Sequence, residues 1–297
     1  MRKRTLGRTG LQVSELGLGG LFVSKVGGRG LEEAVRAVHR ALDLGVNWID
    51  TAPFYGWGRA EELVGRAIAG RRDEVRILTK CGTVRRADGR VAEDASPASV
   101  RTGLQESLRR LGTDYVDVLQ VHDPDPATPV EETWAAIADL IGEGLVGAGG
   151  LSNHPVELME RARAAAPVAV VQHQYSLLHR APETDGVLDW CTAHDCAFLA
   201  WAPLASGFLT AGFDLTVLAP DDLRRRLPWA ARDLTRLRGR LATVAARHGV
   251  PPHRVALAWT ARRPGTYAIA GARTPAEAAD LGPLPHLTTA DLTDLEQ

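Results

Sequence analysis

Three apolar segments of this sequence end on an ionisable residue, and this pattern limits what the chain can fold into. The segments cover residues 46–50, 75–80 and 116–122, and they end on Asp50, Lys80 and His122. A buried charge without a partner is costly, so apolar strands rarely end in this way. Taken alone, Asp50 could cap a turn and Tyr55, five positions later, could fill a gap. If the strands are parallel neighbours, however, all four side chains meet at one sheet edge. We therefore predict a reaction centre there.

Strand-like and helix-like segments alternate along the rest of the chain. Short apolar runs predict strands, and apolar residues at helical spacing predict helices between them. The expected strands cover residues 14–20, 46–50, 75–80, 116–122, 145–150, 168–172, 197–201 and 267–270. The expected helices cover residues 31–44, 61–69, 96–111, 130–141, 187–193, 234–248, 254–261 and 275–280, with one more from about residue 156.

Eight strand–helix units predict an α/β fold, the (β/α)8 TIM barrel, whose active sites lie at the carboxyl ends of the strands. Residues 5–6 and 11–13 flank the glycine-containing turn at residues 7–10 and predict an N-terminal β-hairpin ahead of the barrel. We expect one barrel domain over residues 1–297. The alternative is an open doubly wound sheet with a G-x-G-x-x-G nucleotide fingerprint. The stretch Gly17-Leu18-Gly19-Gly20 matches that fingerprint only in part.

The composition argues against several kinds of partner. A formal net charge of -1 gives no electrostatic reason to expect nucleic acid or an anionic membrane. No apolar run of about 18 residues is present, and no signal-peptide core follows the basic start of the chain. The three cysteines lack the spacing of metal ligands. We therefore expect a reduced, cytoplasmic protein without a bound metal.

The four side chains at the strand ends can manage one proton and one developing alkoxide. A phenol with a pKa of about 10 is a poor acid at neutral pH. The Lys80 ammonium should lower the pKa of Tyr55, while Asp50 should hold Lys80 charged and aimed. His122 could orient the substrate oxygen or join the proton relay. The set lacks a nucleophile–base pair, so it predicts carbonyl reduction by hydride from a cofactor.

Other strand ends carry groups suited to binding that cofactor. Ser152 and Asn153 follow the fifth expected strand, and Gln172 ends the sixth. Trp201 ends the seventh strand and offers a flat face for stacking. Gly20 ends the first strand, where the lack of a side chain lets a ligand approach the backbone closely.

The order and spacing of these stretches resemble the aldo-keto reductase family over nearly the whole chain. The matching stretches are residues 45–55 with Gly56, Gly58 and Glu61, then residues 78–80, 115–122, 151–153, 172–178, 200–210 and 271–273. Each fragment alone is weak, but their combination is specific. The resemblance implies Asp50, Tyr55, Lys80 and His122 as a catalytic tetrad.

The resemblance also implies a nicotinamide cofactor and its contacts. The nicotinamide carboxamide would bind Ser152, Asn153 and Gln172, and the nicotinamide ring would stack on Trp201. The pyrophosphate would follow Leu204, Ser206 and Leu209. The adenosine end would reach Gly271, Ala272 and Arg273, with Glu277 one helical turn further on.

Several positions depart from the family pattern. Gly149 and His154 stand where the family usually has an aliphatic and an aromatic residue, and Trp201 stands where tyrosine is common. After Arg273 the family usually has a glutamine or arginine and then an asparagine; here either Glu277 and Leu281 occupy those places or one residue is missing. The adenosine end is thus the part of the site where this chain differs most.

We expect NADP(H) as the cofactor, with NAD(H) as the alternative. Arg273 could grip a 2′-phosphate bidentately, whereas the Glu277 carboxylate would repel it. The side chains of Phe22, Phe54 and Trp57, together with Trp229, predict an aromatic-walled pocket. Such a pocket fits a small-molecule carbonyl or alcohol substrate, whether aldehyde, ketone, keto-sugar or polyketide.

Three other functions remain open. One is an NAD-dependent sugar or alcohol dehydrogenase of the same family. A second is a regulatory barrel that binds cofactor with little turnover, because function belongs to the site and not to the fold. A third is a barrel acting on sugar phosphates, with the phosphate at the loops after strands seven and eight, where Ser206, Gly207 and Gly271 lie.

Overall fold

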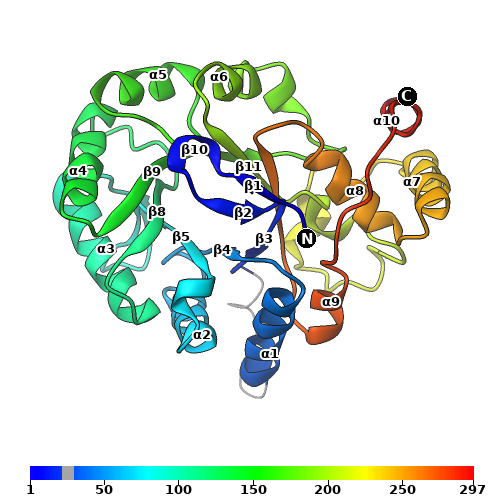
Figure 1. The fold of residues 1–297 in the computed structure, drawn as a ribbon, viewed down its shortest axis with the longest axis horizontal. Helices are drawn as coiled ribbons and strands as arrows, with labels where there is room; N and C mark the ends of the chain where they lie inside the picture. Colours follow the sequence, from blue (N-terminus) through cyan, green and yellow to red (C-terminus); the bar gives the residue numbers. More distant parts are fainter. Residues whose placement is uncertain (22–29) are drawn as a thin grey trace.

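The computed structural model describes residues 1–21 and 30–297, and in them eight parallel strands close into a barrel. Each strand pairs with the next one along the chain, and the last pairs with the first. Helices surround this barrel (Figure 1). The predicted (β/α)8 fold is confirmed. The barrel strands are β3 (Leu16–Gly19), β4 (Trp48–Asp50), β5 (Arg76–Cys81), β8 (Val116–Val121), β9 (Val146–Ser152), β10 (Val170–Gln174), β11 (Ala197–Trp201) and β12 (Thr266–Ala270).

The helices begin and end at residues that favour helix termini, and α3 (Pro97–Leu111) is an example. Ser96 Oγ accepts a hydrogen bond from the Ser99 N–H at 3.3 Å at the start of α3, and Gly112, with φ of 65°, ends that helix. The helices are α1 (Gly30–Asp43), α2 (Arg59–Ile68), α3 (Pro97–Leu111), α4 (Val130–Gly142), α5 (Val156–Ala165), α6 (Val187–Ala193), α7 (Thr235–His248), α8 (Pro252–Thr260), α9 (Pro275–Ala279) and α10 (Thr289–Glu296).

The predicted N-terminal hairpin is also confirmed, and it covers the amino-terminal end of the barrel. Strands β1 (Lys3–Thr5) and β2 (Gln12–Ser14) are antiparallel, and in Figure 1 they lie across the middle of the ring. Leu6 is fully buried against the apolar side chains inside the barrel. Tyr267 Oη of β12 donates a hydrogen bond to the Thr5 carbonyl at 2.6 Å. Any Cβ at Gly7, with φ of 46°, would lie 2.6 Å from the Ala197 nitrogen.

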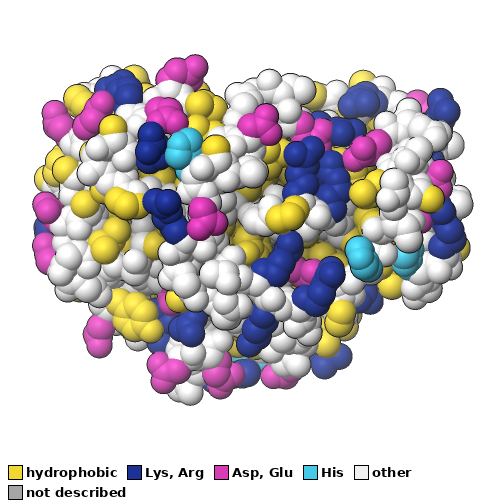
Figure 2. All heavy atoms as spheres, turned by 45° about the horizontal axis from the view of Figure 1, so that its top comes forward, with side chains coloured by type: hydrophobic (Ala, Val, Ile, Leu, Met, Phe, Trp, Pro, Cys, Tyr) yellow, Lys and Arg dark blue, Asp and Glu magenta, His cyan; other side chains and the backbone are white. Residues whose placement is uncertain are grey.

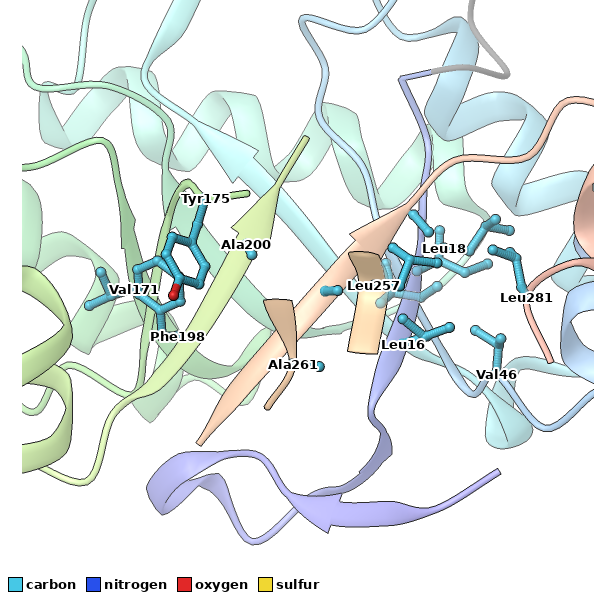
Figure 3. Close-up of a cluster of buried hydrophobic side chains, with 14 of the residues drawn as sticks. Leu16, Leu18, Val46, Val171, Tyr175, Phe198, Ala200, Leu257, Ala261 and Leu281 are labelled. Carbon is cyan, nitrogen blue, oxygen red and sulfur yellow. The ribbon is translucent and has the colours of Figure 1, made fainter. Parts of the chain in front are cut away.

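Two apolar clusters fill the two sides of the sheet. The smaller one lies inside the barrel and includes Trp48, Leu78 and Val118. The larger one lies between the strands and the helices. Figure 3 shows part of it, with Tyr175 and Phe198 beside β11 and with Leu16 and Leu18 on β3. Alternate strand residues therefore face the barrel interior, and this alternation decides which polar side chains reach the site.

Two elements were not expected from the sequence. A second hairpin, β6 (Thr83–Arg85) with β7 (Val91–Glu93), follows β5 where a polar loop was expected. Helix α10 forms in the tail, where Thr288 and Asp291 build a reciprocal capping box.

The face shown in Figure 2 carries both basic and acidic side chains. Within residues 1–21 and 30–297, no helix combines the length and the apolar character needed to cross a bilayer. The same residues contain no cluster of His, Cys, Asp or Glu side chains that could hold a metal ion.

Candidate active site

Lys80 and Asp50 form a buried ion pair at the carboxyl ends of two neighbouring strands. Both side chains occupy inward positions, two residues after the interior residues Leu78 and Trp48. Lys80 Nζ donates hydrogen bonds to Asp50 Oδ2 at 2.7 Å, to the Thr51 carbonyl at 3.0 Å and to Tyr55 Oη at 3.4 Å. The structure thus brings Asp50, Tyr55 and Lys80 together as predicted.

Burial and charge act in opposite directions on Lys80. Burial alone would lower the pKa of its ammonium, but the Asp50 carboxylate and Tyr55 outweigh burial and raise the pKa above its usual range. Lys80 is therefore a cation at neutral pH. A permanent positive charge sits beside the Tyr55 oxygen.

The expectation that Lys80 lowers the pKa of Tyr55 below its usual value is wrong in its net direction. Burial raises the pKa of the phenol, Lys80 partly lowers it, and the carboxylates of Asp50 and Asp123 raise it further. The sequence could not reveal this, because the degree of burial depends on how the loop after β4 packs. In the structure Tyr55 is a protonated phenol, held beside a cation.

The second carboxylate oxygen of Asp50 accepts two amide hydrogen bonds. Gln172 Nε2 donates to Asp50 Oδ1 at 2.8 Å, and Gln120 Nε2 donates to the same atom at 3.0 Å. Gln120 was not among the predicted site residues. It lies on the inward side of β8 with Val118, two residues before His122, so strand alternation alone would have placed it beside the site.

His122 lies against the tyrosine and the aromatic mouth of the site. Its ring centroid is 5.9 Å from those of Tyr55 and Phe54, with the planes nearly perpendicular. Burial, and then the charge of Lys80, lower the pKa of its imidazole to about 3. His122 is therefore neutral at physiological pH, and it can donate or accept a hydrogen bond without carrying charge.

Asn153 joins three strand ends. It has a left-handed backbone, with φ of 59°, and its Nδ2 donates to the His122 carbonyl at 3.2 Å and to Asp123 Oδ1 at 2.9 Å. Its Oδ1 accepts a hydrogen bond from Trp201 Nε1 at 3.1 Å. Asp123, which directly follows His122, was also missed from the sequence. Burial raises the pKa of its carboxyl group.

Ser152 is the last residue of β9 and Gly20 directly follows β3, and a ligand can approach closely at both positions. Ser152 is buried, and its Oγ has no hydrogen-bond partner in the part of the chain that the structure describes. At Gly20, an added Cβ would lie 2.8 Å from Thr51 Oγ1, and its N–H donates to the Asp50 carbonyl at 2.7 Å. A side chain at this position would therefore displace Thr51, directly after β4.

The loop after β11 has an unusual backbone. Ala202, Ala205 and Ser206 all have left-handed backbones, with φ between 49° and 59°, and Gly207 follows with φ of 100°. Leu209 is buried, and its N–H donates to the Leu204 carbonyl at 3.2 Å. The loop is therefore held in a tight turn by its own backbone bonds.

Arg273 and Glu277 bind each other at the start of α9. Arg273 Nη2 lies 2.8 Å from Glu277 Oε1, and the Arg273 backbone N–H donates to Glu277 Oε2 at 2.7 Å. Ala272 beside them is fully buried. The opposing charges inferred from the sequence thus form one exposed pair.

Packing explains the two departures from the family pattern, Gly149 and His154, that flank the segment around Ser152. An added Cβ at Gly149 would lie 3.0 Å from both Trp134 and Ile137 of α4, so large side chains on the helix replace a side chain on the strand. His154 is buried, and its Nδ1–H donates to the Ser152 carbonyl at 2.7 Å. Burial is the main reason that the pKa of His154 falls to about 4.

The residues predicted to line the pocket differ in their exposure to solvent. Phe54 and Trp57 are 36% and 41% exposed, and their rings lie 5.3 Å apart beside His122. Phe22 lies outside the described residues. Trp229 is buried against Phe208 in the core, so it does not form an exposed wall.

A separate hollow of about 620 Å³ lies at the opposite end of the barrel. Its lining comes from the first hairpin and from the residues that precede β4 and β5, and it includes Lys3, Gln12, Asn47 and Arg76. None of the predicted catalytic residues lines it. This hollow is therefore separate from the cluster of Asp50, Tyr55 and Lys80.

The geometry brings a phenol, a fixed cation and a neutral imidazole close together. Tyr55 can release a proton, and Lys80 can stabilise the resulting phenolate. His122 can hold an oxygen atom by a hydrogen bond. The Cys81 thiol beside Lys80 is fully buried, which raises its pKa to about 12, so it is not an activated nucleophile.

Comparison with known proteins identifies relatives of this chain. The family model described as the aldo/keto reductase family matches residues 15–284. The aldo-keto reductase YhdN of Bacillus subtilis is 33% identical over 290 residues, which cover 93% of this chain and 86% of that protein.

Two solved structures share the fold along almost the whole chain. The glycerol dehydrogenase of Gluconobacter oxydans has a TM-score of 0.90 and 30% identity, covering 99% of this chain and 93% of that one. An aldo/keto reductase of Klebsiella pneumoniae, solved in complex with NADP and acetate, has a TM-score of 0.80 and 28% identity. That comparison covers 99% of this chain and 94% of the other.

Proposed function

The chain belongs to the aldo/keto reductase family, and from this premise we propose that it reduces an aldehyde or ketone to an alcohol with NADPH, using Tyr55 as proton donor. The family is one of NAD(P)H-dependent oxidoreductases, so the chain is an enzyme of that class. The observation that supports the finer proposal most directly is the Lys80 ammonium, which contacts both Asp50 and Tyr55 in a buried setting.

The donor and acceptor groups at the strand ends fit a nicotinamide cofactor. Ser152 Oγ is buried and has no partner among the described residues, which is the state expected of a group that binds a ligand. Gln172 has two amide hydrogens, and Asp50 accepts one of them. We propose that these two residues and Asn153 hold the carboxamide. Trp201 would offer its face to the ring.

The phosphate and adenosine ends would bind two other segments. The turn at Leu204, Ser206 and Leu209 would hold the pyrophosphate, and Gly20 would allow close approach from the first strand. Arg273 with Gly271 and Ala272 would bind the adenosine end, with Glu277 beside it. The Klebsiella relative was solved with NADP, which supports the choice of NADP(H) over NAD(H).

The residues of the chain supply the proton and its electrostatic support. When bound, the cofactor supplies a hydride. A substrate carbonyl would accept hydrogen bonds from Tyr55 Oη and the His122 imidazole, which fixes its orientation. As negative charge develops on the carbonyl oxygen, Tyr55 gives up its proton, and Lys80 stabilises the phenolate. Asp50 keeps Lys80 charged and aimed.

Small carbonyl compounds with an apolar part suit the mouth of the site. Phe54 and Trp57 form an exposed aromatic edge next to His122. An aromatic or aliphatic substituent could pack there while its carbonyl reaches Tyr55. Burial of that substituent would favour binding by roughly 25 cal/mol for each Å² of apolar surface removed from water.

The proposal is tested by purifying the protein and following cofactor absorbance with a panel of carbonyl compounds. The panel should include aromatic and aliphatic aldehydes, ketones and aldoses, each with NADPH and with NADH. We expect NADPH oxidation with at least one aldehyde. Glycerol and other alcohols with NADP+ test the reverse direction, because a relative is named as a glycerol dehydrogenase. Tight NADPH binding without turnover would instead support a regulatory barrel.

A further inference from the structure

Gln120 is a buried amide next to the proposed reaction centre. It lies on β8, paired with Lys80 of β5 on one side and with Gly150 of β9 on the other. Its Oε1 is buried and has no hydrogen-bond partner among residues 1–21 and 30–297. An unmet buried acceptor destabilises a fold, so packing alone would favour an apolar residue here. A buried glutamine at this position is therefore better explained by a role in the site than by packing.

The neighbouring strand leaves room for this side chain. An added Cβ at Gly150 would lie 2.9 Å from Gln120 Cγ and 3.0 Å from the Val170 carbonyl oxygen. The first distance is too short for a real Cβ contact and the second is unusually tight, so any other residue at position 150 would push Gln120 or β10 aside. Gly150 and Gln120 thus pack as one unit, and the Gln120 amide is directed at Asp50.

Gln120 and Gln172 play different parts at Asp50, although both donate to Oδ1. Under the proposed function, Gln172 must also bind the carboxamide of the cofactor. Its amide is therefore shared between Asp50 and the cofactor, and the position of its side chain depends on cofactor binding. Gln120 is not among the proposed cofactor contacts, so its bond to Asp50 is the same with and without cofactor.

On the basis of the proposed function, we propose that Gln120 is a positioning residue, which holds the Asp50 carboxylate while Gln172 engages the cofactor. Asp50 in turn holds Lys80 Nζ, which lies 3.4 Å from Tyr55 Oη. If the carboxylate turns, Lys80 follows it and moves away from the phenol. Proton transfer from Tyr55 then loses its electrostatic support, while the cofactor contacts stay in place.

The test replaces Gln120 with methionine, which keeps its length and volume but donates no hydrogen bond. We expect kcat of Gln120→Met to fall about tenfold or more, the size expected from losing one hydrogen bond to a charged group. The NADPH dissociation constant and the substrate KM should stay within about twofold of the parent values. Gln12→Met, the same change on an exposed hairpin residue, is the control and should leave kcat unchanged.

A double variant separates positioning from a purely structural role. If Gln120 acts through Asp50, adding Gln120→Met to Asp50→Asn should change the single-turnover rate by less than about twofold. A structural role would lower the rate by the same factor in both backgrounds, and that result overturns the proposal. So does a kcat of Gln120→Met within about twofold of the parent. If Gln120→Met does not fold, Gln120→Asn, whose amide is one methylene shorter, carries the same expectations.

A crystal structure of the Gln120 variant keeps this inference distinct from the proposed function. We expect a rotated Asp50 carboxylate and a Lys80 Nζ that has moved out of hydrogen-bond distance from Tyr55 Oη. A parent protein that reduces no carbonyl compound would refute the proposed function, yet these positions could still be compared. Unchanged positions of Asp50 and Lys80 in the variant would refute the positioning role alone.

Discussion

Lys80 Nζ and Asp50 Oδ2 lie 2.7 Å apart with both side chains almost completely buried, 1% and 4% exposed. Neither charge is accessible to bulk water, so each depends largely on the other for stabilisation. The pair comes from adjacent strands and lies directly beside the phenol of Tyr55. Its consequences can be measured separately in stability and in rate.

Removing either member of this pair should lower both the stability of the protein and its catalytic rate. We expect Lys80→Met and Asp50→Asn each to lower the free energy of unfolding by about 3–5 kcal/mol, because the remaining polar group loses its partner. The double variant should lose less than the sum. Chemical denaturation measures all three. Arg101→Met, which breaks an exposed pair with Glu143, is the control and should cost less than about 1 kcal/mol. Strict additivity would show that Lys80 and Asp50 are not coupled.

Replacing Tyr55 with phenylalanine should abolish turnover and spare cofactor binding. The hydroxyl is the only part removed, and the proposed cofactor contacts lie on other strands. Steady-state kinetics and fluorescence titration with NADPH measure the two effects. Tyr115→Phe, the same change on a partly exposed residue at the start of β8, should behave as the parent. A Tyr55→Phe rate within about tenfold of the parent would mean that another group, first of all His122, donates the proton.

The buried histidines should make the fold sensitive to mild acid. The pKa of His122 is about 3 and that of His154 about 4 in the folded protein, against about 6.5 in an unfolded chain. Between these values the unfolded state binds more protons, so stability is complete above about pH 6.5 and falls as the pH drops towards 4. Denaturation at several pH values measures this slope. His154→Asn should flatten it, whereas the exposed control His286→Asn should not; equal slopes for parent and His154→Asn would contradict the argument.

The Arg273–Glu277 pair should give a modest preference for NADPH over NADH. An exposed pair of this kind contributes only about 0.3–0.5 kcal/mol, so Arg273 can exchange it for a phosphate contact of about 1.5–3 kcal/mol. Arg273→Ala should erase or reverse the preference, and Glu277→Gln should increase it. The measurement is kcat/KM with each cofactor. Arg161→Ala, which removes an exposed pair between α5 and Glu131 of α4, is the control. A parent that prefers NADH would assign the ribose contact to Glu277 instead.

Gly149 and Gly103 should respond oppositely to alanine. At Gly149 the new Cβ meets Trp134 and Ile137 at 3.0 Å, and overpacking of this kind costs about 1–3 kcal/mol. At Gly103, inside α3, nothing lies within 4 Å of the new Cβ, and alanine should stabilise the helix by about 0.5–1 kcal/mol. Thermal denaturation compares the two. A neutral Gly149→Ala would mean that α4 can shift outward at little cost.

The sequence predicted the parts of the site that depend on strand ends. Asp50, Lys80 and His122 are each the polar end of an apolar run, and the closed barrel brings those ends together. Gln120 was missed because it lies inside such a run, although its inward side is the same as that of His122. The direction of the Tyr55 pKa could not be predicted, because it depends on how the loop after β4 is buried. The hairpin at residues 83–93 had a turn signal in Asp88-Gly89, which is typical of two-stranded connections.

The first hairpin places a constraint on how the protein is made. Thr5 and Tyr267, which hydrogen-bond to each other, are 262 residues apart, so the hairpin is synthesised before every strand it rests on. Until β12 has left the ribosome, Leu6 and Val13 have no barrel interior to enter. Contacts this distant in sequence form late and slowly during folding. The segment made ahead of the barrel is therefore among the last to reach its native position, and Leu6 and Val13 lack a barrel core until synthesis is nearly complete.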